Sequence, residues 1–152
     1  MKYLLVLVFC YSYLFSYTKT TNEHFIEYNL ENNFDALVYS LEDEMINDGF
    51  IISFKSDLGA MVNRMSEYLD DEKIYTKAIK IGFCKNSLGY DLMKENKKNI
   101  IYCPIDIVIY EEKNKKITIL YQLAKSLNKN DTVPVELNKL MVDLIEKTLE
   151  DF

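Results

Sequence analysis

Two runs of β-branched and aromatic residues in the second half of the chain constrain its fold more than any other feature. They are Ile101–Tyr110 and Ile117–Leu123, and the polar segment EEKNKK, which contains Asn114, separates them. Val, Ile and Tyr favour extended backbone, whereas a short polar segment with Asn favours a turn. The pattern therefore predicts a β-hairpin, and with it at least one antiparallel pair of strands.

Four other segments have the periodicity of amphipathic helices, with apolar residues three or four positions apart. The first begins after Asn33, which is suited to cap a helix, and ends before Gly49, which is suited to a left-handed turn. The last begins near Pro134, a residue favoured in a first helical turn. The segments cover residues 34–45, 61–69, 86–95 and 134–148.

Extended segments precede or separate these helices, at residues 24–30, 50–56 and 76–84. In the last of them Ile79, Ile81 and Phe83 alternate with Ala78 and Gly82, so the more apolar face of that strand is expected to meet the core. The predicted order is β-α-β-α-β-α-β-β-α. Helical connections allow parallel strand pairs, so we predict an α+β fold with a mixed sheet and helices packed on it.

The first 16 residues have the form of an export signal. Lys2 precedes an apolar run from Tyr3 to Phe15, and the small residue Ser16 follows it. A run of about 13 residues is shorter than the roughly 20 that cross a bilayer, so cleavage is favoured over a retained anchor. We therefore expect a signal peptide at residues 1–16, a periplasmic or secreted protein, and no membrane association apart from that signal.

The remainder, residues 17–152, has the length of a single domain. The formal net charge is −6 for the whole chain and becomes −7 without Lys2. An acidic protein is poorly suited to bind a polyanion, so nucleic acid is excluded as a partner.

Three stretches resemble a known family: LEDEMINDGFIISFKSDL, IKIGFCKNSLGYDLMKEN and IIYCPIDIVIYEE. They are similar to three blocks of the domain of unknown function 302, and the similarity extends from Tyr28 to the C-terminus. Ser87 departs from the family pattern, which has Pro after the Asn at position 86. The resemblance implies a small α+β fold, a dimer in many members, and no established activity.

Cys84 and Cys103 are the cysteines that remain after removal of residues 1–16. Disulfides persist in exported proteins, so a structural bridge is the first interpretation. If the two strands were parallel neighbours in simple register, the cysteines would lie about 13 Å apart, whereas a bridge needs Cα atoms within about 7 Å. Antiparallel pairing, a register offset or an irregular segment at residues 99–102 would remove this difficulty. Two free or separately buried thiols are the alternative.

A second interpretation treats these cysteines as a redox or ligand site. Cys84 lies just before the helix that begins at Asn86, where backbone N–H groups and the adjacent Lys85 would favour a thiolate. Cys103 precedes Pro104, and the dipeptide is similar to the Cys-Pro of some haem-sensing segments. The ligand-binding candidates are therefore Cys84, Asn86, Cys103 and Pro104.

Other residues of the sequence give only weak indications of a metal-binding or catalytic site. His24 is the single histidine, and Met61 and Met65 share a helix face that would suit copper(I) but is more commonly core. No Ser-His-Asp set or phosphate-binding glycine loop is present, so no catalytic residue, metal site or cofactor is predicted. The adjacent carboxylates have the pattern of solvated charge at the ends of elements, and they are Asp70 with Asp71 and Glu111 with Glu112.

These patterns favour an exported α+β domain that acts as a non-catalytic binding or accessory protein of the periplasm. Its partner would be a periplasmic protein, a small ligand or a second copy of the chain. The alternative is a thiol-based redox or haem/metal-handling protein that uses Cys84 and Cys103.

Overall fold

The computed structural model describes residues 17–150, which form one six-stranded sheet with helices packed against it. The expected signal at residues 1–16 lies outside the described residues. The strands are β1 (Tyr17–Thr21), β2 (Phe25–Glu31), β3 (Ile51–Asp57), β4 (Lys77–Cys84), β5 (Ile105–Glu111) and β6 (Lys116–Gln122). The helices are α1 (Phe34–Asn47), α2 (Leu58–Tyr68), α3 (Asn86–Glu95), the short 3-10 helix η1 (Lys97–Tyr102) and α4 (Val133–Glu150).

The strand order in the sheet is β1-β2-β6-β5-β4-β3, and all of these neighbours are antiparallel. The predicted α+β class and the approximate order of elements are confirmed, but the sheet is not mixed in the described part of the chain. The reason is that α2 joins β3 to β4 and α3 joins β4 to β5, and both pairs are antiparallel neighbours. Only a parallel pair requires a crossover helix, so a helical connection does not by itself indicate parallel strands.

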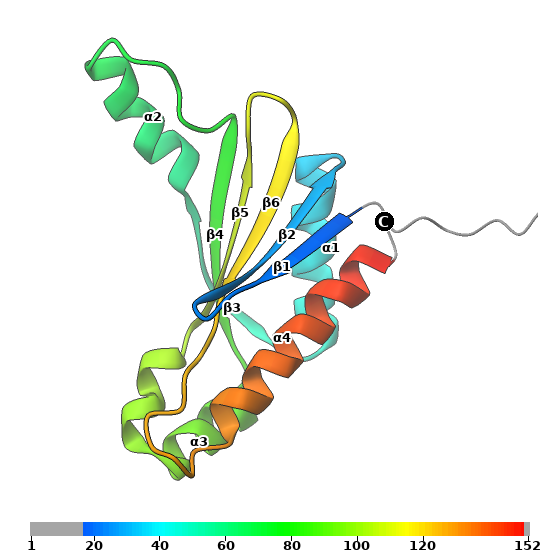
Figure 1. The fold of residues 1–152 in the computed structure, drawn as a ribbon, viewed down its shortest axis with the longest axis vertical. Helices are drawn as coiled ribbons and strands as arrows, with labels where there is room; N and C mark the ends of the chain where they lie inside the picture. The colour runs from blue at the N-terminus through cyan, green and yellow to red at the C-terminus, as the bar shows by residue number, and fades with distance from the viewer. Residues whose placement is uncertain (1–16, 151–152) are drawn as a thin grey trace, which may run out of the picture.

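Two of the four α-helices pack on the sheet and two lie at its ends (Figure 1). The α1 helix carries the chain from β2 to the far edge strand β3, and α4 packs beside it. In contrast, α2 and α3 leave the sheet at its two opposite ends (Figure 1). The sheet thus has one face covered by α1 and α4 and one face without a helix, as is common for antiparallel sheets.

Alternation along the central strands accounts for the core. Ile81 and Phe83 of β4 and Ile107 and Ile109 of β5 are fully buried beneath the covering helices. This confirms the predicted inward face of β4. The helices contribute the apolar stripe that the sequence predicts for α1, which is Phe34, Leu37, Val38, Leu41 and Met45.

The predicted ends of α1 are also confirmed. The Oδ1 atom of Asn33 accepts a hydrogen bond from the N–H of Ala36 at 3.0 Å, as an N-cap residue does. Gly49 has φ of 80°, a conformation that other residues adopt only with strain. It turns the chain so that Phe50 enters the core and β3 begins.

Two elements were not predicted. β1 is an edge strand that pairs with β2 from Tyr17 opposite Leu30 to Thr21 opposite Ile26, although its residues are polar and mostly exposed. The second is η1, which occupies residues where the β5 strand was expected to begin. The peptide bond between Cys103 and Pro104 is cis, and β5 starts directly after it.

Helix α2 differs from its prediction in its orientation. Met61 and Met65 were expected to be core residues, yet they are 53% and 55% exposed. The face of α2 that lies against the sheet consists of Gly59, Asn63 and Ser66. No helix within residues 17–150 is both long enough and apolar enough to span a bilayer.

Candidate functional site

The structure brings Cys84 and Cys103 together. Because β4 and β5 are antiparallel, with Phe83 opposite Ile105, the end of one strand meets the start of the other. The two Cα atoms are 5.9 Å apart and the side chains are joined by a disulfide. The separation of about 13 Å that parallel strands would impose therefore does not arise.

Of the four ligand-binding candidates, Cys84, Cys103 and Pro104 lie at this junction. Cys84 and Cys103 are half-buried and Pro104 is exposed. Asn86 is also exposed and begins α3 as predicted. A Cβ atom built on Gly89 of α3 would be 3.5 Å from the sulfur of Cys84, so this helix packs directly against the bridge.

Lys85 does not direct its charge toward the sulfur atoms as the redox interpretation expected. Its Nζ donates a hydrogen bond to the carbonyl oxygen of Asp48 at 2.7 Å and lies over the ring of Phe50. A cation at that carbonyl is favourable because it satisfies the C-terminal end of α1. The lysine therefore stabilises the turn from α1 into β3.

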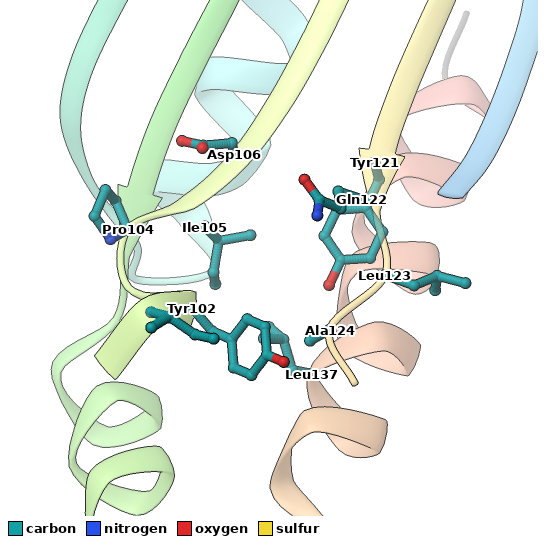
Figure 2. Close-up of a pocket in the computed structure, with 10 residues that line it drawn as sticks. Tyr102, Pro104, Ile105, Asp106, Tyr121, Gln122, Leu123, Ala124 and Leu137 are labelled. Atoms are coloured by element: carbon teal, nitrogen blue, oxygen red, sulfur yellow. The ribbon is translucent and has the colours of Figure 1, made fainter. Parts of the chain in front are cut away.

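A hollow of about 170 Å³ lies next to Pro104, where β5 and β6 separate (Figure 2). Pairing between these strands begins at Ile107 opposite Tyr121, so Ile105 and Asp106 pair with β4 but not with β6. After β6, the N–H of Leu123 bonds to the carbonyl of His24 instead. At this point β5 is bonded to β4, and the segment that follows β6 is bonded to His24. A space therefore remains between β5 and β6.

Both apolar and polar groups line this hollow, and its tyrosine hydroxyls are already bonded. Tyr102 Oη donates to the carbonyl of Lys125 at 2.7 Å and also accepts from the Lys125 N–H. Tyr121 Oη donates to Asn138 Oδ1 at 2.9 Å, and burial raises the pKa of this phenol well above its usual value. These hydrogen bonds hold the two tyrosine side chains in place as parts of the wall.

Asp106 supplies the unsatisfied polar atom of the hollow. Its Oδ2 pairs with Lys80 at 2.7 Å, while its Oδ1 is buried and has no hydrogen-bond partner in the described structure. Asp106 and Gln122 also line a second hollow of about 290 Å³ on the helix-free face of the sheet. We call these two adjoining hollows the Asp106 groove, and the floor of the second is formed by Phe25, Val108 and Leu120.

Figure 2 shows how the two sides of the first hollow face each other. Tyr102 and Ile105 point into the space from the β5 side and Gln122 points into it from the β6 side, whereas the Asp106 carboxylate is directed toward β4 and Leu123 points away (Figure 2). The Gln122 side chain makes no hydrogen bond within residues 17–150 and is exposed. Gln122 can therefore bond directly to a molecule placed between the strands, whereas Asp106 can do so once its side chain rotates away from β4.

These polar residues were missed in the sequence because Asp106 interrupts an apolar run by one position only. The alternation of PIDIVIY does place Asp106 on the outward face of its strand, and the predicted strand of residues 76–84 places Lys80 on its outward face. What the alternation does not show is that these strands are neighbours, with Asp106 opposite Gly82 and hence diagonal to Lys80.

Of the remaining sequence candidates, His24 lies at the Asp106 groove and the carboxylate pairs lie outside it. His24 is at the rim of the second hollow and pairs with Glu23 at 3.0 Å. Asp70 and Asp71 are exposed as expected, whereas Glu111 is 5% exposed, so its interpretation as solvated charge is wrong. Within residues 17–150 no three His, Cys, Asp or Glu side chains are grouped as a metal site would require.

Comparison with known proteins places this fold in a family. The family described as "Domain of unknown function DUF302" matches residues 26–150. A solved structure, the uncharacterized conserved protein DUF302 from Bacillus stearothermophilus, is similar with a TM-score of 0.63 and 15% sequence identity, over 82% of this chain and 95% of that one. No curated protein matches. Because the family match spans most of the 152 residues, the chain belongs to the family of the domain of unknown function DUF302.

Proposed function

We propose that this protein is a small exported domain that binds a ligand in the Asp106 groove and does not catalyse a reaction. The observation that carries the proposal is the Asp106 Oδ1 atom, which is buried without a partner where two hollows adjoin. An unsatisfied buried carboxylate oxygen is unfavourable by about 1–3 kcal/mol or more. Rotation of the side chain would turn this oxygen into the groove, where a ligand that donates a hydrogen bond to it would recover that free energy.

The surroundings of Asp106 define the chemistry of the ligand. Lys80 neutralises the carboxylate charge, so the ligand needs an N–H or O–H donor but no positive charge. Ile105 in the first hollow and Leu120 in the second offer apolar contact on either side of Asp106. The groove therefore suits a neutral molecule with an apolar body and one polar hydrogen, as most small-molecule sites combine apolar walls with few polar groups.

Two matched probes test the proposal by ligand titration followed with ¹H–¹⁵N NMR. Benzamide has an apolar ring and an N–H donor, whereas methyl benzoate has a similar shape and no donor. We expect benzamide to shift the amide signals of Asp106 and Gln122 and methyl benzoate to bind about tenfold more weakly or not at all, because a hydrogen bond to a charged acceptor contributes roughly 1.5–3 kcal/mol.

The Asp106→Ala variant should bind benzamide about tenfold more weakly than the wild-type protein does. Asp91→Ala is the matched control, since Asp91 is an exposed carboxylate of α3. Equal affinity of the two probes, or shifts confined to residues outside the Asp106 groove, would contradict the proposal.

Export and the state of the cysteines form part of the same proposal. The sequence of residues 1–16 supports export, and an oxidising compartment supports retention of the Cys84–Cys103 bridge. The bridge ties the start of β5 to β4, on the side of the hollow opposite β6. We propose that its role is to keep β5 apart from β6. Association of two copies stays a prediction that sedimentation at several concentrations would test.

The alternative function uses the cysteines as reduced thiols. It draws support from their half-buried positions, which leave the bridge within reach of a reductant. Visible absorption of the reduced protein mixed with haem or copper(I) would test it. A spectrum that is unchanged by Cys84→Ser and by Cys103→Ser would count against ligation.

A further inference from the structure

A third hollow, which also contains unsatisfied polar groups, lies at the opposite end of β4 from the Asp106 groove. It has a volume of about 510 Å³ and is bounded by α2, by β4 and by the start of α1. We call it the α2–β4 groove. Its width is set at Gly59, where a Cβ atom would lie only 2.7 Å from the backbone nitrogen of Ala78. The volume is within the range of about 300–1,000 Å³ that is typical of small-molecule sites.

Charged side chains line this groove, and most are paired with each other. Lys77 bonds to Asp35 at 2.6 Å, and Lys73 lies 3.6 Å from Glu67. The third acid, Asp57, accepts a hydrogen bond from the N–H of Ala60 at 2.7 Å and so caps α2.

Arg64 is the positively charged side chain of the groove that takes part in none of these ion pairs. It is the single arginine of the sequence, it lines the groove, and it has no ion pair or side-chain hydrogen bond in the part of the chain that the structure describes. Its planar guanidinium presents two parallel N–H donors, a geometry that matches a carboxylate better than the point charge of a lysine does. The groove thus has an unoccupied anion-binding group on the wall formed by α2.

Asn63, one residue earlier, contributes an unsatisfied acceptor. The side chain is 9% exposed and lines the same groove. Its Nδ2 donates to the carbonyl of Tyr75 at 2.8 Å, which fixes the orientation of the amide. Its Oδ1 is buried and has no hydrogen-bond partner among the described residues. A buried acceptor of this kind is uncommon in folded proteins and needs a donor.

We propose that the α2–β4 groove binds a small carboxylate that carries an adjacent N–H donor, the pattern found at the C-terminus of a peptide and in a free amino acid. Arg64 binds the carboxylate, and Asn63 Oδ1 accepts the N–H after a small outward movement of α2. This site is separate from the Asp106 groove and does not depend on it.

Three small-molecule probes of nearly equal size distinguish the carboxylate interaction from the N–H interaction without any change to the protein sequence. N-acetylglycine has both the carboxylate and the N–H. Levulinate has a CH₂ in place of that N–H, and N-acetylglycinamide has a neutral amide in place of the carboxylate. We expect N-acetylglycine to shift the side-chain signals of Arg64 and Asn63 in ¹H–¹⁵N NMR, with each of the other probes at least about tenfold weaker. A parallel titration with glycine distinguishes a free amino acid from a peptide end.

The Arg64→Gln variant should weaken N-acetylglycine binding by at least about tenfold, since it removes the bidentate charge-assisted contact. Lys129→Gln is the control, because it makes the same change in net charge at an exposed residue outside the groove. The proposal is overturned if N-acetylglycine does not bind, if levulinate binds equally well, or if Arg64→Gln binds with unchanged affinity.

Discussion

The aromatic ring of Phe54 lies over Gly82 on the helix-free face of the sheet. The two residues are partners in adjacent strands, and a Cβ atom built on Gly82 would be 2.1 Å from Cε1 of the ring. The pairing shifts register between Ile52 and Phe54, so β3 is bulged immediately before this contact. Gly82 therefore leaves the space that the ring above it occupies.

Substitution of Gly82 by Ala should displace the Phe54 ring and lower the free energy of unfolding by about 1–3 kcal/mol. The ring is 37% exposed, so it can swing toward solvent and the change should stay near the lower value. Urea unfolding measures it. In a Phe54→Ala background the same substitution should be neutral or stabilising, because glycine is unfavourable within a strand. An equal loss in both backgrounds would show that the ring is not the cause.

Gly59→Ala should be more disruptive, because the atom that a Cβ would meet is the backbone nitrogen of Ala78 and not a movable side chain. Alanine favours helix over glycine by about 1 kcal/mol, yet we expect a net loss of about 1–3 kcal/mol. Hydrogen exchange should show faster exchange in α2 with little change in α4. Unchanged protection of α2 would contradict the close approach of this helix to β4.

The Cys84–Cys103 bridge closes a loop with a sequence separation of 19 residues. Constraint of the unfolded chain by a loop of this length contributes about 3 kcal/mol. The double variant Cys84→Ser/Cys103→Ser should lose that amount in urea unfolding. Intact mass of the unfolded wild-type protein should show alkylation at these two positions only after reduction. Two additions without a reductant would mean that the thiols are free.

High pH should unfold the protein through its buried tyrosines. Burial raises the pKa of Tyr28 and of Tyr121 above the ordinary value of 10.0, and the Glu146 carboxylate adds to the shift of Tyr28. Below pH 10 both states keep these protons, so the stabilisation is fully present. Above pH 10 the unfolded state loses protons that the folded state retains, so stability falls.

The expected slope above pH 10 is about 1.4 kcal/mol per pH unit for each such tyrosine. Urea unfolding at a series of pH values would measure it. Tyr121→Phe should remove the contribution of one tyrosine to this slope. It should also lower the free energy of unfolding by the same amount at every pH, because the hydrogen bond to Asn138 is lost. Tyr39→Phe, at a residue that is 70% exposed, is the control for loss of a hydroxyl at the surface. Identical slopes in all three proteins would refute the prediction.

Local features of the fold were predictable because they depend on neighbouring residues. The cap at Asn33, the turn at Gly49 and the inward face of β4 follow from residue type and periodicity, and the structure confirms each. The β5–β6 hairpin was predictable for the same reason, since a short polar turn connects its strands.

The candidate sites were less accessible from the sequence. Cys84, Cys103 and Pro104 were identified, and Pro104, which follows the bridged Cys103, lines the first hollow. Asp106 and Arg64 were not, because each is marked by an unsatisfied group, and satisfaction depends on which segments become neighbours. The apolar residues Met61 and Met65 predicted a buried stripe, but tight contact at Gly59 turned the opposite face of α2 toward β4.

The sequence by itself determined most of the local elements, although not β1 or η1, together with the α+β class and the family to which the chain belongs. Only the tertiary structure decided that every described strand pair is antiparallel and that the two cysteines meet. It also decided that β5 and β6 separate beside Asp106. Strand pairing joins residues that are distant in the chain through backbone hydrogen bonds, which carry almost no information about side-chain identity. The order of strands therefore follows from how all the apolar faces can be buried together, and not from any one segment.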